Sequence, residues 1–467
     1  MSQRGLGDTF ANDDRGTGRS GDGAPQSLGA LVRSWPWAMP LVLGAVIARL
    51  VAVAGIHLYR YFDSAEYEKL DFSGRWRRPW TTPLLYQLLP DSDAAVVAGQ
   101  ALIGAFAWVV LAFAVAALFQ RRNVRVTVAV LALATGCTAV VTNWDTTMLS
   151  EPMAISLTVL VLAAWTDFVR RPTTVGAIAI VAASIPWMFV RQSLMPTAWM
   201  TVLFALAMTL GALSRHRSAG AAVPQIALVA GLAVGCVWAT VSYSRNQEII
   251  HHNITAIVTD RIAPKPGARK WFVDRGMPMP VNGRTDFLAF DQDVAFQRWV
   301  AKSGNSTYLK FLATSPWYSV TAPLADFVGA NRSFREVPPF ADPKAPPVTM
   351  LASAEPYGSS RTVLPGPLED VLLRGGAVGS VLCGLVVAAG WTFARREDAD
   401  GRWAVPAATV VLAALSLYAA WHGASTELPR LGLPGAVALR IAVVTVLGLL
   451  VEVELNRRDL RRGANRH

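Results

Sequence analysis

An acidic and aromatic cluster follows the first long apolar segment of this 467-residue chain. Asp63, Glu66 and Tyr67 lie within five residues of one another, shortly after an apolar run that ends near residue 56. A carboxylate at the lip of a membrane span can act as a general base toward a hydroxyl group. Asp63 is the preferred candidate for this base because it comes first, and Glu66 is the alternative.

A second polar segment reads TNWDTTMLSEPMAI and contains Asp145 and Glu151. Pro152 suits the first turn of a helix, and Ser150 before it is expected to cap that helix. Glu151 then lies at the positive end of the helix dipole. Capping accounts for these residues without any function, yet both acids are expected to face the same compartment as Asp63, so both interpretations stay open.

Arginines near the predicted spans could bind an anion. Arg191 is the only charged residue in the segment IPWMFVRQSLMP. It can snorkel to the interface, or bind a lipid phosphate with its fork of donors. Arg440 lies inside the last apolar run, where a charge is costly and usually faces the bundle interior with a partner. Glu427 and Arg430 flank the start of that run.

The composition indicates a membrane protein. Hydrophobic residues make up 53% of the chain and charged residues only 16%, against about 25% in soluble proteins. The net charge of +11 comes from short basic blocks between apolar runs, which argues against nucleic-acid binding and fits the determinants of membrane orientation.

Ten apolar segments approach the length of about 20 residues that a spanning helix needs. They are 36–56, 94–119, 126–142, 151–169, 174–190, 195–213, 222–241, 368–392, 403–421 and 434–454. The sequence therefore predicts an all-α polytopic membrane protein with about ten transmembrane helices. Arginines accumulate in alternate loops, so the positive-inside rule predicts that both termini lie in the cytoplasm. The expected location of the protein is the plasma membrane.

This topology divides the chain into five parts. They are a disordered cytoplasmic tail (1–33), a seven-helix module (34–241) with an outward loop at 57–93, an extracytoplasmic subdomain (242–367), three C-terminal helices (368–455) and a basic tail (456–467). An amphipathic helix is expected near 285–303, and interface helices are expected in the first outward loop.

The sequence predicts neither a metal site nor a disulfide bond. His251 and His252 are adjacent, and no H-x-x-x-H or HExxH spacing occurs. The three cysteines, Cys137, Cys236 and Cys383, lie apart in apolar runs. No metal and no cofactor are expected.

Together these segments resemble the GT-C superfamily of membrane glycosyltransferases. The resemblance rests on Asp63-Ser64 with Tyr67, on Asn143-Trp144-Asp145 running into Leu149-Ser150-Glu151-Pro152, on Arg191, and on the order Glu427, Arg430, Arg440. It covers most of residues 36–245 and, weakly, the C-terminal helices. Where the superfamily has paired acids, this chain has Asp-Ser.

The resemblance implies transfer of a sugar from a polyprenyl-phosphate donor to a cell-envelope glycan or glycolipid outside the cytoplasm. Asp63 or Glu66 would be the base. The remaining residues would bind substrate: Tyr67, Asp145, Glu151, Arg191, Glu427, Arg430 and Arg440. The most similar subgroup would be the actinobacterial cell-envelope mannosyl- and arabinosyltransferases, and the sequence identifies no sugar and no oligomeric state.

Three other classes remain open. One is a structural or assembly protein of the membrane, which would leave Asp63, Arg191 and Arg440 without a shared cavity. A polymerase or ligase of lipid-linked glycans would depend on His251, Arg261 and Arg275 in the large loop. A transporter would show internal repeats and matched broken helices, and the two halves of this sequence show no convincing repeat.

Overall fold

The computed structural model describes Gly29 and residues 35–60, 64–76, 78–215, 222–280, 283–332, 360–373, 384–387, 389–390, 402–423 and 428–464. These ranges contain helices and loops and no β-strand, so the all-α prediction is confirmed for them. The long helices are α2 (Ala38–Val53), α4 (Asp93–Ala116), α5 (Arg122–Gly136), α7 (Glu151–Arg170), α8 (Thr174–Met188), α9 (Met195–Arg215), α10 (Val223–Ser244), α19 (Ala404–Gly423) and α20 (Leu428–Ala464).

Six described helices, α4, α7, α9, α10, α19 and α20, are long and apolar enough to cross a membrane. A seventh span results if α5 and α6 (Ala139–Thr142), which continues as the 3₁₀ turn η2 (Asn143–Thr146), are one span bent by 48°. The expected count of about ten is therefore not confirmed. α2 and α8, with 16 and 15 residues, fall short of a full span, and most of 374–392 lies outside the described residues.

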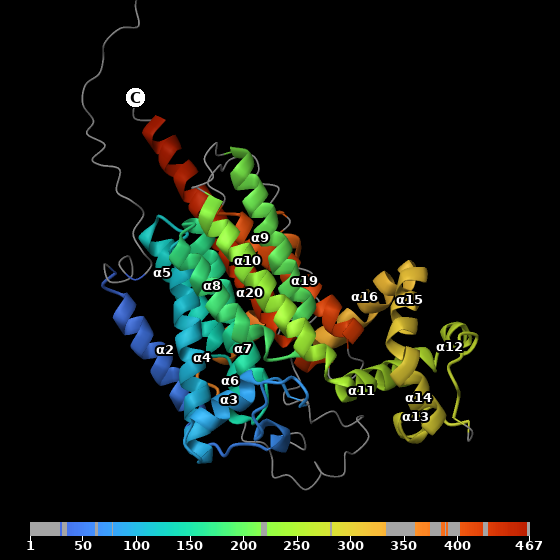
Figure 1. Cartoon of the computed structure of the whole chain (residues 1–467). Helices are drawn as coiled ribbons and strands as arrows, with labels where there is room; N and C mark the ends of the chain where they lie inside the picture. The colour runs from blue at the N-terminus through green and yellow to red at the C-terminus, as the bar shows by residue number, and fades with distance from the viewer. Residues whose placement is uncertain are drawn as a thin grey trace, which may run out of the picture.

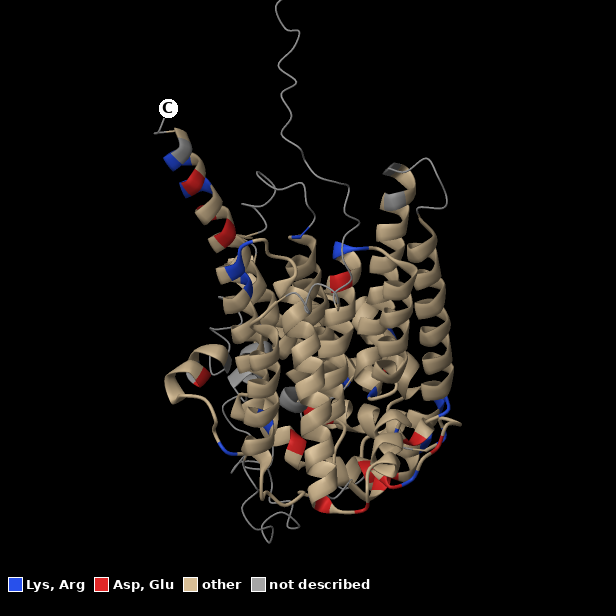
Figure 2. Ribbon diagram, turned by 90° about the vertical axis from the view of Figure 1, so that its left-hand side faces the viewer, with Lys and Arg blue, Asp and Glu red and all other residues tan. Residues whose placement is uncertain are grey.

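The long helices form one bundle (Figure 1). α4 packs against α2, α5 and α7, while α10 packs against α8 and α9, and α19 pairs with α20. Acidic and basic residues gather mainly at the two ends of the bundle, with a largely uncharged band between them (Figure 2). This distribution suits a bilayer, because the hydrocarbon core disfavours charge.

One end of the bundle, called the loop end below, carries the described residues 54–60, 64–76, 78–92, 143–150 and 189–194 (Figure 1). Its first connection contains the 3₁₀ turn η1 (Ser64–Tyr67) and the short helix α3 (Thr81–Leu88). Thr81 Oγ1 donates to the carbonyl oxygen of Pro186 at 2.8 Å, which ties α3 to the end of α8. The opposite end, where α20 extends beyond the other helices, is called the tail end (Figure 1).

The described residues between 247 and 332, which are 247–280 and 283–332, form a cluster of helices beside the loop end (Figure 1). They are α11 (Gln247–Ile257), the π-helix η5 (Val258–Ile262), α12 (Pro266–Val273), α13 (Phe287–Gln292), α14 (Val294–Trp299), the π-helix η6 (Val300–Gly304), α15 (Asn305–Thr314) and α16 (Pro316–Arg332). Phe272, Phe290 and Phe296 are completely buried at its centre.

The amphipathic helix expected at 285–303 is broken in the structure. Asp293 lies between α13 and α14 in an extended conformation, and its carboxylate accepts a hydrogen bond from Phe296 N at 2.8 Å. An aspartate that caps a new helix in this way interrupts the preceding one. Asp286 caps α13 in the same manner through Ala289 N.

Candidate functional site

At the loop end, the first connection docks on the polar segment before α7. Tyr59 N donates to the carbonyl oxygen of Thr146 at 2.8 Å, and Met148 N donates to that of Tyr59 at 2.9 Å. Ser64 Oγ adds a bond to the carbonyl oxygen of Met148 at 2.9 Å. The first connection and the segment before α7, which are about 85 residues apart in the sequence, are thus joined by hydrogen bonds. Asp63 lies outside the described residues.

Glu66 is held by a neighbouring arginine. Its Oε2 lies 2.7 Å from Arg78 Nε, and both side chains are about four-fifths buried. The Arg78 guanidinium also lies over the Tyr67 ring, at 4.9 Å from its centroid. Tyr67 is buried and meets Tyr86 edge to face at 6.3 Å. The side chains of Glu66 and Tyr67 therefore have defined positions beside α3.

Asp71 shapes the exposed part of this connection. Its carboxylate accepts bonds from the backbone nitrogens of Ser73 and Trp76, at 2.8 and 2.9 Å. Partial burial raises the pKa of Asp71, but these bonds, together with those from the Ser73 hydroxyl and Arg75 N, outweigh burial and lower the pKa below its usual value. The turn is thereby stabilised while the carboxylate is charged.

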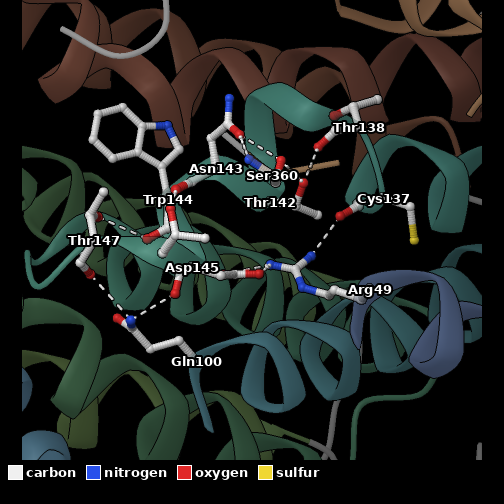
Figure 3. A network of polar contacts seen from close by, with 12 residues as sticks. Arg49, Gln100, Cys137, Thr138, Thr142, Asn143, Trp144, Asp145, Thr147 and Ser360 are labelled. Atoms are coloured by element: carbon white, nitrogen blue, oxygen red, sulfur yellow. Dashed lines mark hydrogen bonds and ion pairs between the residues drawn. The ribbon is translucent and has the colours of Figure 1, made fainter. Parts of the chain in front are cut away.

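Asp145 takes part in a buried ion pair with Arg49 of α2 (Figure 3). Arg49 Nη2 lies 3.0 Å from Oδ1 and 2.8 Å from Oδ2 of Asp145, and Arg49 Nη1 donates to the carbonyl oxygen of Gly136 at 2.6 Å. Gly136 ends α5 at the bend of the broken span. The pair therefore fastens α2 to both sides of that bend.

Further polar side chains hold the backbone around Asp145 (Figure 3). Gln100 Nε2 donates to the carbonyl oxygens of Asp145 and Thr147, at 2.9 and 3.2 Å. Tyr86 Oη lies 3.1 Å from Gln100 Oε1 and 2.8 Å from the carbonyl oxygen of Leu149. The network thus runs from α2 through α4 to α3.

Glu151 and Arg191 form a second buried ion pair at the loop end, through Oε1 and Nη2. Arg191 Nε donates to Ser150 Oγ at 2.7 Å. The expected capping by Ser150 is wrong: it sits at the N-cap in a helical conformation, and its side chain makes no capping bond. Its hydroxyl serves Arg191 instead, while Pro152 does occupy the first turn as expected.

The remaining predicted residues lie on or next to α20. Arg440 is buried, as expected for a charge in a span, and its Nη1 donates to the carbonyl oxygen of Ala436 at 2.9 Å. It is twelve residues from Leu428, so about 18 Å from the start of α20 along the helix axis. Glu427 and the side chain of Arg430 lie outside the described part.

An apolar pocket extends between α7, α9, α19 and α20. It contains about 690 Å³ of empty space, part of it open to the outside. Val169 and Val405 line it toward the tail end, and Trp187 and Leu194 line it toward the loop end. Trp187 and Leu194 flank Arg191 in the sequence, so the pocket reaches the neighbourhood of the Glu151–Arg191 pair.

The structure thus brings Glu66, Tyr67, Asp145, Glu151 and Arg191 to one end of the bundle. Sequence reasoning missed their partners Arg49, Arg78, Tyr86 and Gln100. Arg49 and Gln100 could have been found, because a charge or an amide inside an apolar run needs a polar partner. Among the described residues, no group of three or more His, Cys, Asp or Glu side chains could hold a metal ion.

No protein-family model matches this chain, and no characterised protein has a significantly similar sequence.

Proposed function

We propose that this protein is a membrane glycosyltransferase of the GT-C type, which transfers a sugar from a polyprenyl-phosphate donor to a cell-envelope glycan or glycolipid. One observation carries the proposal. The first connection, with its acids and tyrosine, docks on the segment that holds Asp145 and Glu151, beside an apolar pocket that reaches the same end of the bundle.

The pocket suits the isoprenoid chain of the donor, because most of its walls are apolar side chains of the long helices α7, α9, α19 and α20. Arg191 is proposed to hold the donor phosphate at the loop end of the pocket. Glu151 and Ser150 orient its guanidinium, so the Arg191 side chain loses less conformational entropy when an anion binds. Arg430 is proposed to assist in phosphate binding and Glu427 to bind substrate, while Arg440, about 18 Å along α20 from Leu428, is given no direct contact with the phosphate in this proposal.

The reaction requires one base and one anion site. The base removes the proton of an acceptor hydroxyl, the hydroxyl oxygen forms a bond to the sugar C1, and the bond from C1 to the phosphate oxygen breaks. The lipid phosphate leaves with that electron pair, in a single displacement with inversion. Asp63 is the favoured base because it comes first in the connection, and Glu66 is the alternative, with one of its carboxylate oxygens held by Arg78.

Asp145 takes a positioning role in this proposal. Its carboxylate is 1% exposed and paired with Arg49, so it reaches substrate less readily than Glu66 does. By fastening the bend after Gly136, the pair supports the segment on which the first connection docks. We also propose that the loop end faces outward and the tail end, with Arg457, Arg458, Arg461 and Arg462, faces the cytoplasm of the cell.

A second candidate function, ligation or polymerisation of lipid-linked glycans, is favoured by one observation. Arg261, from the large loop, is buried against the outer turn of α19. Its guanidinium lies 3.9 Å from the Trp421 ring centroid, and Tyr308 Oη lies 3.3 Å from His422 Nδ1 nearby. Burial raises the pKa of the Tyr308 hydroxyl, so it stays protonated and can donate.

Donor binding tests the proposal. The purified protein is titrated in detergent with a synthetic polyprenyl phosphate, with polyprenol of the same length as the control. We expect the phosphate to raise the thermal midpoint of unfolding and the alcohol to raise it less, since only the phosphate can bind the arginines. If the two lipids raise the thermal midpoint equally, the pocket binds lipids without recognising the phosphate. That result would contradict the proposed anion site.

A further inference from the structure

Helix α16 presents an apolar stripe to its surroundings. Trp317, Val320 and Leu324 are 79%, 50% and 63% exposed, and their spacing of three and four residues puts them on one face of the helix. A neighbouring face of the helix carries the buried residues Ser319 and Pro323. No charged residue occurs from Ser315 to Ala325. Such a stripe in water is costly and calls for an apolar partner.

The position of α16 is defined by its contacts with the bundle. The helix packs on both α19 and α20 and lies between the bundle and α15 (Figure 1). The carbonyl oxygen of Ser319 lies 3.1 Å from His422 Nε2, and the Tyr318 ring lies 6.1 Å from that of Trp421. The first turns of α16 are therefore level with the loop end of α19.

We propose that α16 is an interfacial helix whose Trp317–Val320–Leu324 stripe contacts the lipids of the outer leaflet. The helix on which α16 packs also presents apolar side chains, because Val411 and Tyr418 of α19 are exposed on a helix long enough to span the bilayer. Tryptophan is favoured at the level of the lipid headgroups, and an uncharged face can enter the acyl boundary.

Helix α15 fits the same placement. Leu309 is 58% exposed, and the neighbouring Lys310 is also exposed. A lysine beside an apolar side chain can extend its ammonium group toward lipid phosphates while its stem stays in the apolar region. The α15–α16 pair would thus hold the cluster of residues 247–332 against the bilayer, whatever reaction the protein performs.

Depth-dependent quenching tests this contact. Single cysteines are introduced as Trp317→Cys, Leu324→Cys and Lys270→Cys in a full-length protein from which Cys137, Cys236 and Cys383 have been removed. Each is labelled with an environment-sensitive fluorophore and reconstituted in phosphatidylcholine vesicles. Lys270 in α12, whose side chain is 76% exposed, is the matched control in the same cluster. The quenchers are iodide on both sides of the membrane and lipids with a nitroxide on the acyl chain.

We expect labels at 317 and 324 to emit at shorter wavelength than the label at 270, with severalfold stronger quenching by nitroxide lipids and weaker quenching by iodide. Iodide quenching equal to that at position 270 would overturn the proposal, because the stripe would be in water. Blue-shifted emission that neither quencher reduces would also overturn it, since a second copy or residues 333–359 would then cover the stripe. If Trp317→Cys does not fold, the result at 324 decides.

Discussion

Arg49 and Asp145 form an ion pair inside the bundle, although 96 residues separate them in the sequence. Their side chains are only 2% and 1% exposed, and the contact joins α2 to the turn that follows the bent span. Two charges in such a place are tolerated only as a pair, because each alone would be desolvated without compensation. The pair therefore determines how α2 meets the loop end.

Removal of one member of this pair should destabilise the protein strongly. Arg49→Met and Asp145→Leu should each lower the free energy of unfolding by about 3–5 kcal/mol, because each leaves one buried charge unpaired. The double variant should regain most of the loss, since no charge remains. Reversible unfolding in detergent measures the three values.

Arg60→Met is the control for this series. Arg60 Nη2 lies 3.0 Å from Asp93 Oδ1, but both side chains are about half exposed, and such pairs contribute roughly 0.2–1 kcal/mol. Additive losses in the double variant would mean that Arg49 and Asp145 do not act as a pair.

Gly104 of α4 gives a second way to disturb the same pair. A Cβ at this position would overlap the guanidinium of Arg49. Gly104→Ala should therefore displace Arg49 and destabilise the protein, although alanine favours helix over glycine by about 1 kcal/mol. The loss should be smaller in the Arg49→Met/Asp145→Leu background.

Gly44→Ala in α2 is the matched control, because its Cβ would meet no atom within 4 Å. Unfolding measurements should find this variant unchanged or slightly more stable. Equal behaviour of the two glycine variants would show that Arg49 has room to move.

Helix positions were predictable where apolar runs are long and bounded by polar residues. The run 151–169 corresponds to α7, and 195–213 corresponds to α9. The predicted last span, 434–454, is longer in the structure, because α20 continues to Ala464 through charged residues that a helix beyond the membrane accommodates. A hydropathy pattern detects the apolar part of a helix and not its polar extension.

Partners of the charged side chains were not predictable, because they come from distant parts of the chain. The reasoning that singled out Arg440 applies equally to Arg49, which also lies within an apolar run, yet nothing in the sequence identifies Asp145 as its partner. Likewise, Ser150 has the sequence signature of a cap, and only the packing of Arg191 explains its different role.

Arg191→Lys should weaken binding of a polyprenyl phosphate about tenfold. Lysine keeps the charge, and so the pairing with Glu151, but it loses the fork of donors and the bond to Ser150. Calorimetric titration of the purified variant measures the affinity. Arg170→Lys, which changes an arginine paired with Asp167 at the tail end, should bind normally. Unchanged affinity of Arg191→Lys would make Arg191 a purely structural residue.

Topology can be tested by labelling intact cells with a membrane-impermeant maleimide. Cysteine at Lys270 should react from outside, while cysteine at Arg458, which is 62% exposed in the long extension of α20, should react only after permeabilisation. The arginine distribution leads to this expectation. The opposite labelling pattern would mean that the protein has the inverse orientation in the membrane, and it would contradict a reaction on the outer face.

The initial rate of sugar transfer from a synthetic polyprenyl-phosphate sugar tests the central claim most directly. Wild-type protein in vesicles should transfer the sugar, and Asp63→Asn should be about 10²–10⁴-fold slower with nearly unchanged donor affinity, because only the base is lost. Glu66→Gln should be affected less, since Arg78 already holds Glu66, and Glu454→Gln at the exposed tail end should match wild type. Near-normal transfer by both Asp63→Asn and Glu66→Gln, or donor binding without any transfer by wild type, would contradict the account.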